Sequence, residues 1–180
     1  MKKINLPDRY LMTKKFLRGE IGVVVDKSIS ADGKDSVERD GRYWNFSDGT
    51  RVHCRFDEGD RVAVLQSYRD AGLPKCKFGD CLGWTKKVSV NPKYMPTAMV
   101  VDKVRVMRVK ELTDAEMCKS GVVPAGRKWQ IGGEIGGAEN TPAESFARMF
   151  NRRFSELWDE NPWVVVYDIT PVGIGEIKGR

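Results

Sequence analysis

The stretch SELWDENPWVVVYDIT, Ser155–Thr170, decides how this chain of 180 residues folds. A helix-like apolar pattern ends at Trp158, and Asp-Glu-Asn-Pro follows as a break. The next segment, Trp163–Tyr167, is almost wholly apolar and rich in β-branched and aromatic residues, which is typical of a strand buried on both faces. Chain ends usually fray, yet this segment lies close to the C-terminus. We therefore expect it to pair with strands from earlier in the chain.

Apolar spacing predicts most of the elements that precede this segment. Residues 8–18 have apolar side chains near helical spacing, and Gly19 is a suitable end for that helix. A β-branched run predicts a strand over 21–29. Two further strands are predicted, one over 61–68 after an acidic Gly-containing turn, and a longer one over 98–109 with alternation at its centre.

Two capping boxes predict where helices begin in the second half of the chain. Thr113 with Glu116, and Thr141 with Glu144, have the spacing in which side chain and backbone cap each other. Pro142 stands at the first helical position of the second box, where proline is favoured. One apolar stripe follows, which we interpret as core: Phe146, Met149, Phe150, Phe154, Leu157 and Trp158.

Three segments are predicted to be irregular or inserted. Residues 30–56 contain three Asp-Gly pairs, which are strong hairpin signals and predict a β-meander. Residues 69–95 are predicted to be a loop because glycine and proline recur along them. Residues 121–140 hold six glycines and predict a long, mobile loop, although they lack the residues of a phosphate-binding loop.

The last strand of the predicted meander alternates between apolar and polar residues. Val52, Cys54 and Phe56 would face one way. The opposite face would carry two cations and the only histidine of the chain: Arg51, His53 and Arg55. Such a row is more often a solvated outer face, which we expect here, while contact with phosphate is the alternative.

Strands outnumber crossover helices in this order of elements. We therefore predict one α+β domain over residues 1–180, built as a closed or nearly closed β-barrel flanked by a few helices. In a barrel the last strand pairs with earlier ones and removes the exposed edges. That role would explain the apolar character of Trp163–Tyr167.

Composition limits the compartment and the class of partner. No apolar run reaches the length of a membrane span, and the N-terminal residues do not resemble a signal peptide, so we expect a cytoplasmic protein. The net charge of +6 suits nucleic acid or another polyanion, although solubility alone would also account for it. Free thiols, no metal and no cofactor are expected, and zinc binding is left open for four residues: His53, Cys54, Cys76 and Cys81.

Several segments resemble the ASCH domain, a PUA-like β-barrel, in its phage and prophage form. The matching stretches are FLRGEIGVVVDK (16–27), GDRVAVLQSY (59–68), MPTA (95–98), DKVRVMRVKELTDAEMCKSGV (102–122) and FSELWDENPWVVVYDI (154–169). The last two are the most specific, and the resemblance covers most of residues 8–170. The meander and the glycine-rich segment are additions to the family pattern.

The resemblance implies binding of RNA, or of a base or nucleoside, in a cleft on the barrel. Some small members of the family hydrolyse N4-acetylcytidine with a Lys, a Thr and a Glu. The positions that match these three residues hold Ile21, Val24 and Ser120. A further family motif is replaced by Leu65-Gln66-Ser67. Because Ile and Val neither attack a carbonyl nor move protons, we expect binding without catalysis.

Candidate contacts with nucleic acid are aromatic residues in or beside loops, for stacking, and nearby polar or cationic residues. They are Arg18, Lys27, Arg61, Gln66, Tyr68, Trp84, Lys86, Lys87 and Trp129. RNA is the expected partner in preference to DNA.

One alternative is a nucleoside or nucleic-acid hydrolase with a rearranged site, in which Glu20 would be catalytic. The other is a phage-encoded factor that acts on a host protein. The ligand and the oligomeric state are not determined by the sequence.

Overall fold

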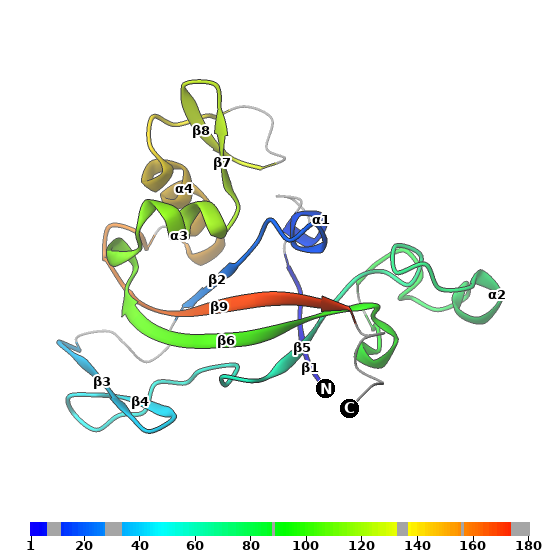
Figure 1. Cartoon of the computed structure of the whole chain (residues 1–180), viewed down its shortest axis with the longest axis horizontal. Helices are drawn as coiled ribbons and strands as arrows, with labels where there is room; N and C mark the ends of the chain where they lie inside the picture. The colour runs from blue at the N-terminus through cyan, green and yellow to red at the C-terminus, as the bar shows by residue number, and fades with distance from the viewer. Residues whose placement is uncertain (7–11, 28–33, 88, 133–136, 156, 174–180) are drawn as a thin grey trace.

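A five-stranded sheet forms the centre of the computed structural model (Figure 1). The structure describes residues 1–6, 12–27, 34–87, 89–132, 137–155 and 157–173. In spatial order the strands of the sheet are β1 (Lys2–Ile4), β5 (Arg61–Val64), β6 (Thr97–Arg108), β9 (Trp163–Gly173) and β2 (Val23–Lys27). β1 pairs with β5 in parallel, and the other neighbours are antiparallel.

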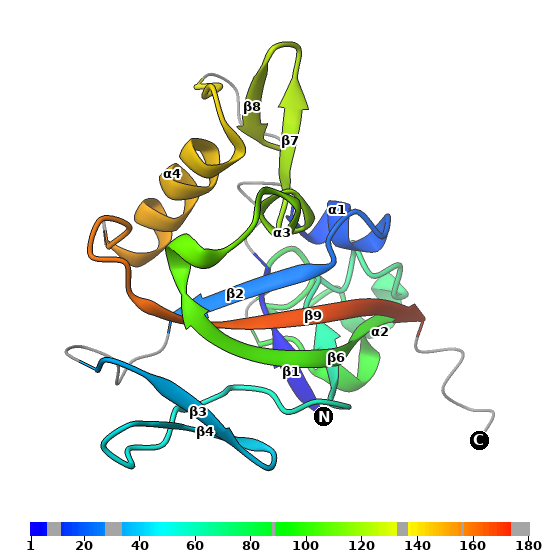
Figure 2. The same cartoon turned by 60° about the vertical axis from the view of Figure 1, so that its left-hand side comes forward.

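The sheet is open, which differs from the predicted barrel. Among the described residues β1 and β2 are its two edges, and no ladder joins them. The α+β class is confirmed, and the strands lie between layers of other elements (Figure 2). At the β2 edge a side chain takes the place of a further strand, because Arg153 donates from Nη1 to the carbonyl oxygen of Val25 at 3.1 Å. Covering an edge in this way is an alternative to closing a barrel.

β9 is an interior strand, and its first part, Trp163–Tyr167, is buried on both faces. It pairs with β6 along its whole length and with β2 along its first half. Val164 and Val166 face the layer that contains the helices. Trp163, Val165 and Tyr167 face the opposite core cluster, under the β3–β4 hairpin described below. The predicted buried strand is therefore confirmed, and its continuous apolar run results from two covered faces rather than from barrel closure.

The helical layer contains α3 (Asp114–Lys119), α4 (Pro142–Phe154) and a hairpin of β7 (Val122–Ala125) with β8 (Lys128–Ile131). Both predicted capping boxes are confirmed. Thr113 and Thr141 accept hydrogen bonds from the backbone N–H groups of Glu116 and Glu144, at 3.3 and 3.1 Å. The cap at Thr141 sets the start of α4 and so directs its apolar stripe onto the sheet.

The predicted mobile loop over 121–140 is corrected by the β7–β8 hairpin, although residues 133–136 lie outside the described part. Val122 and Ile131 are buried, and Ser145 of α4 donates its hydroxyl to the carbonyl oxygen of Trp129 at 2.7 Å. Glycine content concealed this hairpin, although its turn uses glycine for a specific purpose: Gly126 there has φ of +67°, which favours glycine.

A second hairpin covers the other face of the sheet. It joins β3 (Val37–Asp40) to β4 (Tyr43–Phe46), and Gly41 in its turn has φ of +58°. The turn at Asp48-Gly49 is also formed, whereas the Asp32-Gly33 pair lies outside the described residues.

The third strand predicted for the meander is absent from the described residues as a ladder. Only one isolated bridge, between Asn45 and Arg51, follows β4. The predicted alternation is nevertheless confirmed: Val52 and Phe56 are buried and Cys54 is half-buried. The exposed set is Arg51, His53 and Arg55. Core packing, together with a backbone hydrogen bond from Val52 to the carbonyl oxygen of Trp44 at 2.8 Å, holds this segment in place of a full ladder.

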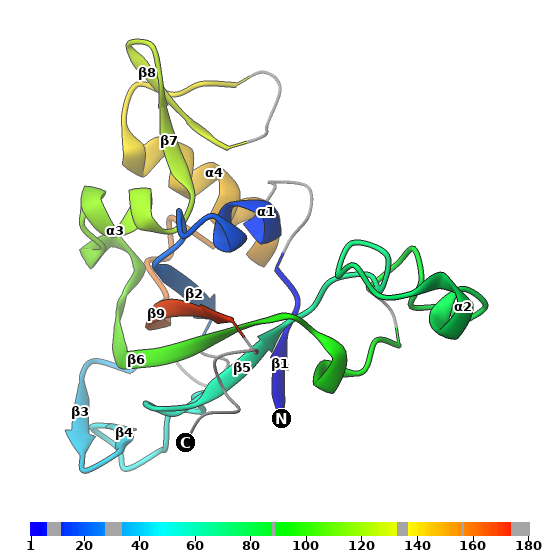
Figure 3. The ribbon, with the colours of Figure 1, turned by 45° about the vertical axis from the view of Figure 1, so that its right-hand side comes forward.

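Two further parts complete the fold. α1 (Met12–Leu17) lies beside β2 and is followed by Gly19, with φ of +74°. Residues 7–11 of the predicted helix lie outside the described part. A lobe over residues 65–96 projects from the end of β5 and contains α2 (Lys75–Phe78) and the 3-10 turn η2 (Pro92–Tyr94) (Figure 3). The lobe has its own apolar cluster, so the predicted loop is partly structured.

No helix in the described ranges has the length and apolarity to cross a bilayer.

Replacing Val165 with aspartate should test the position of β9. Val165 is buried and lies opposite Asp26 of β2, so the variant would bury an unpaired charge next to a second carboxylate. We expect the free energy of unfolding to fall by about 3–5 kcal/mol. Urea unfolding followed by circular dichroism measures it. Val172→Asp, at a half-exposed position of the same strand, is the matched control, and equal midpoints for the two variants would contradict the assignment.

Candidate functional site

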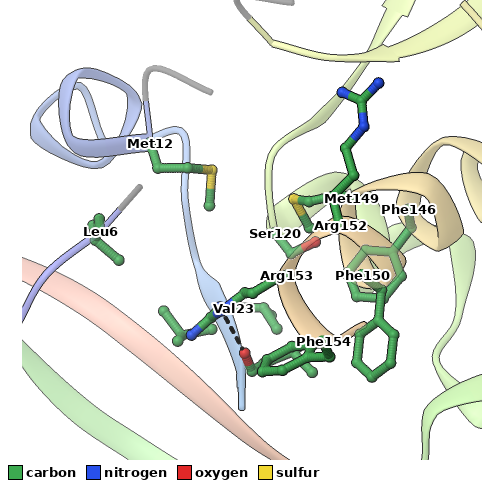
Figure 4. A pocket seen from close by; sticks show the side chains of 12 residues that line it. Leu6, Met12, Val23, Ser120, Phe146, Met149, Phe150, Arg152, Arg153 and Phe154 are labelled. Carbon is green, nitrogen blue, oxygen red and sulfur yellow. Dashed lines mark hydrogen bonds between the residues drawn. The ribbon is translucent and has the colours of Figure 1, made fainter. Parts of the chain in front are cut away.

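An apolar pocket of about 250 Å³ lies at the outer edge of β2. β2 passes between α1 and the chain before it on one side and α4 on the other (Figure 4). The residues that line the pocket are Leu6, Met12, Val23, Val24, Val25, Ser120, Phe146, Met149, Phe150, Arg152, Arg153 and Phe154. Five separate segments of the chain therefore contribute to it.

The wall on the α4 side is a column of aromatic rings. Phe146, Phe150 and Phe154 repeat at a spacing of four residues and so lie on one face of the helix. The Phe146 and Phe150 rings stack with centroids 6.2 Å apart, and the Phe150 and Phe154 rings are 4.7 Å apart. Phe146 and Phe150 are almost fully buried, so the half-buried ring of Phe154 is the part of this wall that is most accessible to a flat apolar ligand.

The wall on the β2 side presents backbone polar groups. In an antiparallel pair, alternate residues turn both their N–H and C=O groups away from the partner strand. The carbonyl oxygen of Val25 accepts from Arg153 and therefore points away from β9. Val23, two residues earlier, has the same orientation. The pocket thus borders an N–H and C=O edge that suits hydrogen bonding to a planar ligand.

Arg153 and Arg152 place two guanidinium groups at the pocket. Arg153 extends across to β2, where it also pairs with Asp26 at 3.4 Å, whereas Arg152 points away from β2 (Figure 4). Burial lowers the pKa of Arg153, Asp26 opposes this shift, and the like charge of Arg55 adds to it. Arg153 remains cationic at neutral pH because an arginine pKa is so high.

Among the lining residues that the structure describes, Ser120 alone carries a side-chain hydroxyl. It is 3% exposed, and its Oγ donates to the carbonyl oxygen of Met117 at 2.7 Å. The hydroxyl proton is therefore engaged, and the oxygen is left as an acceptor toward the pocket. This arrangement favours recognition of a ligand N–H group.

Lys15 is a buried cation next to the pocket that the sequence did not indicate. It is 8% exposed, and its Nζ donates to the carbonyl oxygen of Gly121 at 2.9 Å. Burial lowers the pKa of Lys15, and the charge of Glu20 opposes this shift only in part. Lys14 and Lys15 are adjacent lysines on a short helix, and nothing in the sequence indicates that the side chain of Lys15 turns inward.

The resemblance placed hydrolase chemistry at three positions, and the structure locates them around this pocket. Val24 and Ser120 both line it, and Ile21 is fully buried just before β2. Sequence positions nearly a hundred residues apart are therefore brought to one cavity. The chain has apolar side chains and one serine where an amide hydrolase would need a nucleophile and a proton carrier.

The predicted catalytic residue lies elsewhere. Glu20 is in the turn between α1 and β2, its side chain is 45% exposed, and it forms an ion pair with Arg18 at 3.8 Å. Neither residue lines the pocket. Their predicted roles remain predictions.

The other predicted contacts are dispersed. Lys27 lies in a separate hollow beside His53 and Arg55, and Arg61 is exposed on β5. Trp129 is half-buried and packs against the cluster under α4. The structure does not bring these residues together, and none of them lines the apolar pocket.

Five predicted contacts belong to the α2 lobe or to its base. Gln66 and Tyr68 are buried, and Trp84 packs against the lobe's own apolar cluster. Lys87 donates from Nζ to the carbonyl oxygen of Leu6 at 3.0 Å and to the Thr13 hydroxyl, which ties the lobe to the body of the protein. These side chains therefore have structural contacts that a loop assignment did not predict.

Lys86 of the same lobe is exposed, unlike its neighbour Lys87.

The cysteines considered for zinc are far apart. Cys54 lies beside the β3–β4 hairpin, whereas Cys76 and Cys81 are exposed in the α2 lobe at the opposite end of the molecule (Figures 1 and 3). Within the described ranges no three residues of the metal-binding types gather.

No protein-family model, curated protein sequence or solved structure matches the chain significantly. The resemblance to the ASCH domain is therefore carried only by the segments quoted above. What the pocket binds has to be argued from its shape and chemistry.

The lowered pKa of Lys15 predicts a pH-dependent contribution to stability. Between that value and the ordinary 10.5, the unfolded chain holds a proton that the folded protein has released, so stability rises with pH. We expect the free energy of unfolding of the wild type, relative to Lys15→Met, to increase as pH rises toward 10.5. Urea unfolding at a series of pH values measures this. Lys14→Met, at the exposed neighbouring position, is the control, and a flat or falling difference for Lys15 would refute the prediction.

Proposed function

We propose that this protein is a non-catalytic, ASCH-like binding module that holds an unpaired base of RNA, or a modified base or nucleoside, in the apolar pocket. One observation carries the proposal: an aromatic wall and a strand edge face each other across the same cavity. An unpaired base needs both, because its faces stack on aromatic rings while its edge forms hydrogen bonds.

The size of the pocket supports a small ligand. Sites for drug-sized molecules occupy about 300–1,000 Å³. The cavity of about 250 Å³ lies just below that range, which suits a single base or nucleoside rather than a dinucleotide. A longer polynucleotide would therefore insert one nucleotide and continue outside.

The charges around the pocket support a phosphorylated ligand. Arg152 and Arg153 stand at its border, and the chain as a whole has a net charge of +6. Guanidinium groups bind phosphate through two parallel hydrogen bonds, which a lysine does not reproduce. The resemblance to the ASCH domain leads to the same class of ligand.

The lining residues support binding without catalysis. Among those that the structure describes, none is an Asp, Glu, His, Cys or Lys. Ser120 donates its proton to a backbone carbonyl and has no base among the lining residues to activate it. The hydrolase alternative would have to use Glu20, which faces solvent next to Arg18.

The alternative of a phage factor acting on a host protein has one feature in its favour. Leu82, in the projecting α2 lobe, is 77% exposed. A single exposed leucine is common on protein surfaces and is weak evidence for an interface. We therefore place this alternative second.

Filling the pocket should abolish nucleoside binding. Ser120→Leu adds a branched side chain inside the cavity, whereas Ser120→Ala keeps the space and removes only the hydroxyl. We expect at least a tenfold loss of affinity for the first variant and about a fivefold loss for the second, which corresponds to one hydrogen bond. NMR titration with cytidine, uridine, adenosine, guanosine and N4-acetylcytidine measures both, with melting temperature as the folding control. If no nucleoside binds the wild type, the pocket does not serve this function.

Purified protein should not hydrolyse N4-acetylcytidine above background, because the pocket supplies no activated nucleophile. Chromatographic detection of released cytidine is the assay. Turnover that is lost in Glu20→Gln would establish the hydrolase alternative instead.

A further inference from the structure

The layer that contains the β3–β4 hairpin and residues 52–56 has a surface of its own, separate from the apolar pocket. Two hollows lie on it and share His53. Arg42 and Arg51 line the first hollow, and Lys27 and Arg55 line the second. We call these five residues the hairpin basic surface.

The core holds this surface in place. The backbone N–H of Arg55 donates to the hydroxyl oxygen of Tyr167 at 2.9 Å, and the Phe56 and Tyr167 rings meet edge to face with centroids 5.3 Å apart. Because Val52 and Phe56 are buried on one side of the segment, the cations between them project from the other. Their positions relative to β9 are thus fixed by packing.

The cations are not neutralised by nearby carboxylates. Asp57 borders the first hollow and Asp26 the second, but each pairs with a cation that lines neither hollow. Asp57 pairs with Lys2 at 3.4 Å, and Asp26 with Arg153 at 3.4 Å. Among the described residues, no carboxylate forms an ion pair with any of the four cations of the surface. The surface therefore keeps a positive field.

Arg42 and Arg51 are gathered on one aromatic ring. The guanidinium carbons lie 4.8 and 3.2 Å from the centroid of the Tyr43 ring, which is 37% exposed. The pKa of the Tyr43 phenol is lowered by the adjacent Arg51 first and by Arg42 second. Two like charges held together in this way repel each other, and an anion bound between them would relieve the repulsion.

The surface continues into the apolar pocket. Asp26 borders the second hollow and Arg153 lines the pocket, and these two side chains form the ion pair across the β2 edge. Arg55 is close enough to influence the pKa of Arg153. A chain that leaves the pocket past Arg153 would therefore meet Arg55, His53 and then the hairpin.

We propose that the hairpin basic surface binds the sugar–phosphate backbone of a single-stranded polynucleotide whose base occupies the apolar pocket. The inference rests on the proposed function for its choice of ligand. Successive phosphates of a single strand can each contact one of the separate cations on this surface. A base that enters a pocket has to be unpaired. The inserted meander would then add affinity for the chain that flanks the bound base.

The test compares two pairs of substitutions in the two hairpins. Arg42→Ala with Arg51→Ala removes the pair on Tyr43. Arg127→Ala with Lys128→Ala removes the same charge from exposed positions at the turn of β7–β8, on the other side of the sheet (Figures 1 and 2). Fluorescence anisotropy with a labelled ten-nucleotide uridine RNA, and with its DNA counterpart, gives affinity across a salt series.

Each phosphate contact on a single strand contributes about −0.7 to the slope of log affinity against log salt. The first pair should therefore reduce the magnitude of the slope by about 1.4, and the β7–β8 pair should leave it unchanged. Arg42→Lys with Arg51→Lys keeps both charges and should retain most of the slope. Equal losses for both alanine pairs, or no loss for either, would overturn the inference.

Nucleosides separate this result from the proposed function, since they carry no phosphate. The Arg42 and Arg51 alanine pair should bind nucleosides as the wild type does, while Ser120→Leu should lose them and keep part of the salt dependence with RNA. If nucleosides fail to bind the wild type but RNA binding still depends on Arg42 and Arg51, the backbone surface stands without the pocket. Melting temperatures of all variants confirm that they are folded.

Discussion

The fold depends on β9 being covered on both faces and paired on both edges. Over Trp163–Tyr167 this strand leaves almost no surface for water, so the layers on either side have to be built around it. α3 and α4 cover the face that carries Val164 and Val166, and the β3–β4 hairpin and residues 52–56 cover the other. β6 and β2 flank it in the sheet. The helical layer and the hairpin layer are thus separate structures that share one strand.

Polar contacts fix how these layers meet the sheet. Arg105 of β6 binds Asp168 of β9 through two hydrogen bonds, at 2.9 and 3.2 Å, and also binds Glu116 of α3. Burial opposes ionisation of Glu116, yet hydrogen bonds from Thr113 and the charge of Arg105 lower its pKa overall. On the hairpin side, burial raises the pKa of Tyr167, whose oxygen accepts from the Arg55 backbone. The pocket and the basic surface are each positioned by one of these contacts.

Local chemistry was predictable from the sequence, and long-range pairing was not. The Thr113 and Thr141 caps, the Asp40-Gly41 turn and the alternation after Val52 each depend on a few adjacent residues, and all are present. The open sheet depends on which strands meet, including the parallel pairing of Lys2–Ile4 with β5, which three residues do not specify. The pocket is harder still, because Leu6, Val23, Ser120 and Arg153 come from four segments and none has a motif of its own.

The position of the pocket follows from the same constraint as the fold. Since β9 occupies the interior, β2 is left as an edge whose N–H and C=O groups need partners. Arg153 satisfies one carbonyl, and the proposed base would pair with the groups beside it. An apolar cavity favours the proposed binding of a base over catalysis, because a charged catalytic group without a partner would be costly to bury inside it. Lys15 illustrates that cost at the neighbouring position, where burial already lowers its pKa. In the proposed arrangement the base would lie in the apolar pocket, and the phosphates would lie on an exposed basic surface, where desolvation of the charged contacts would cost less.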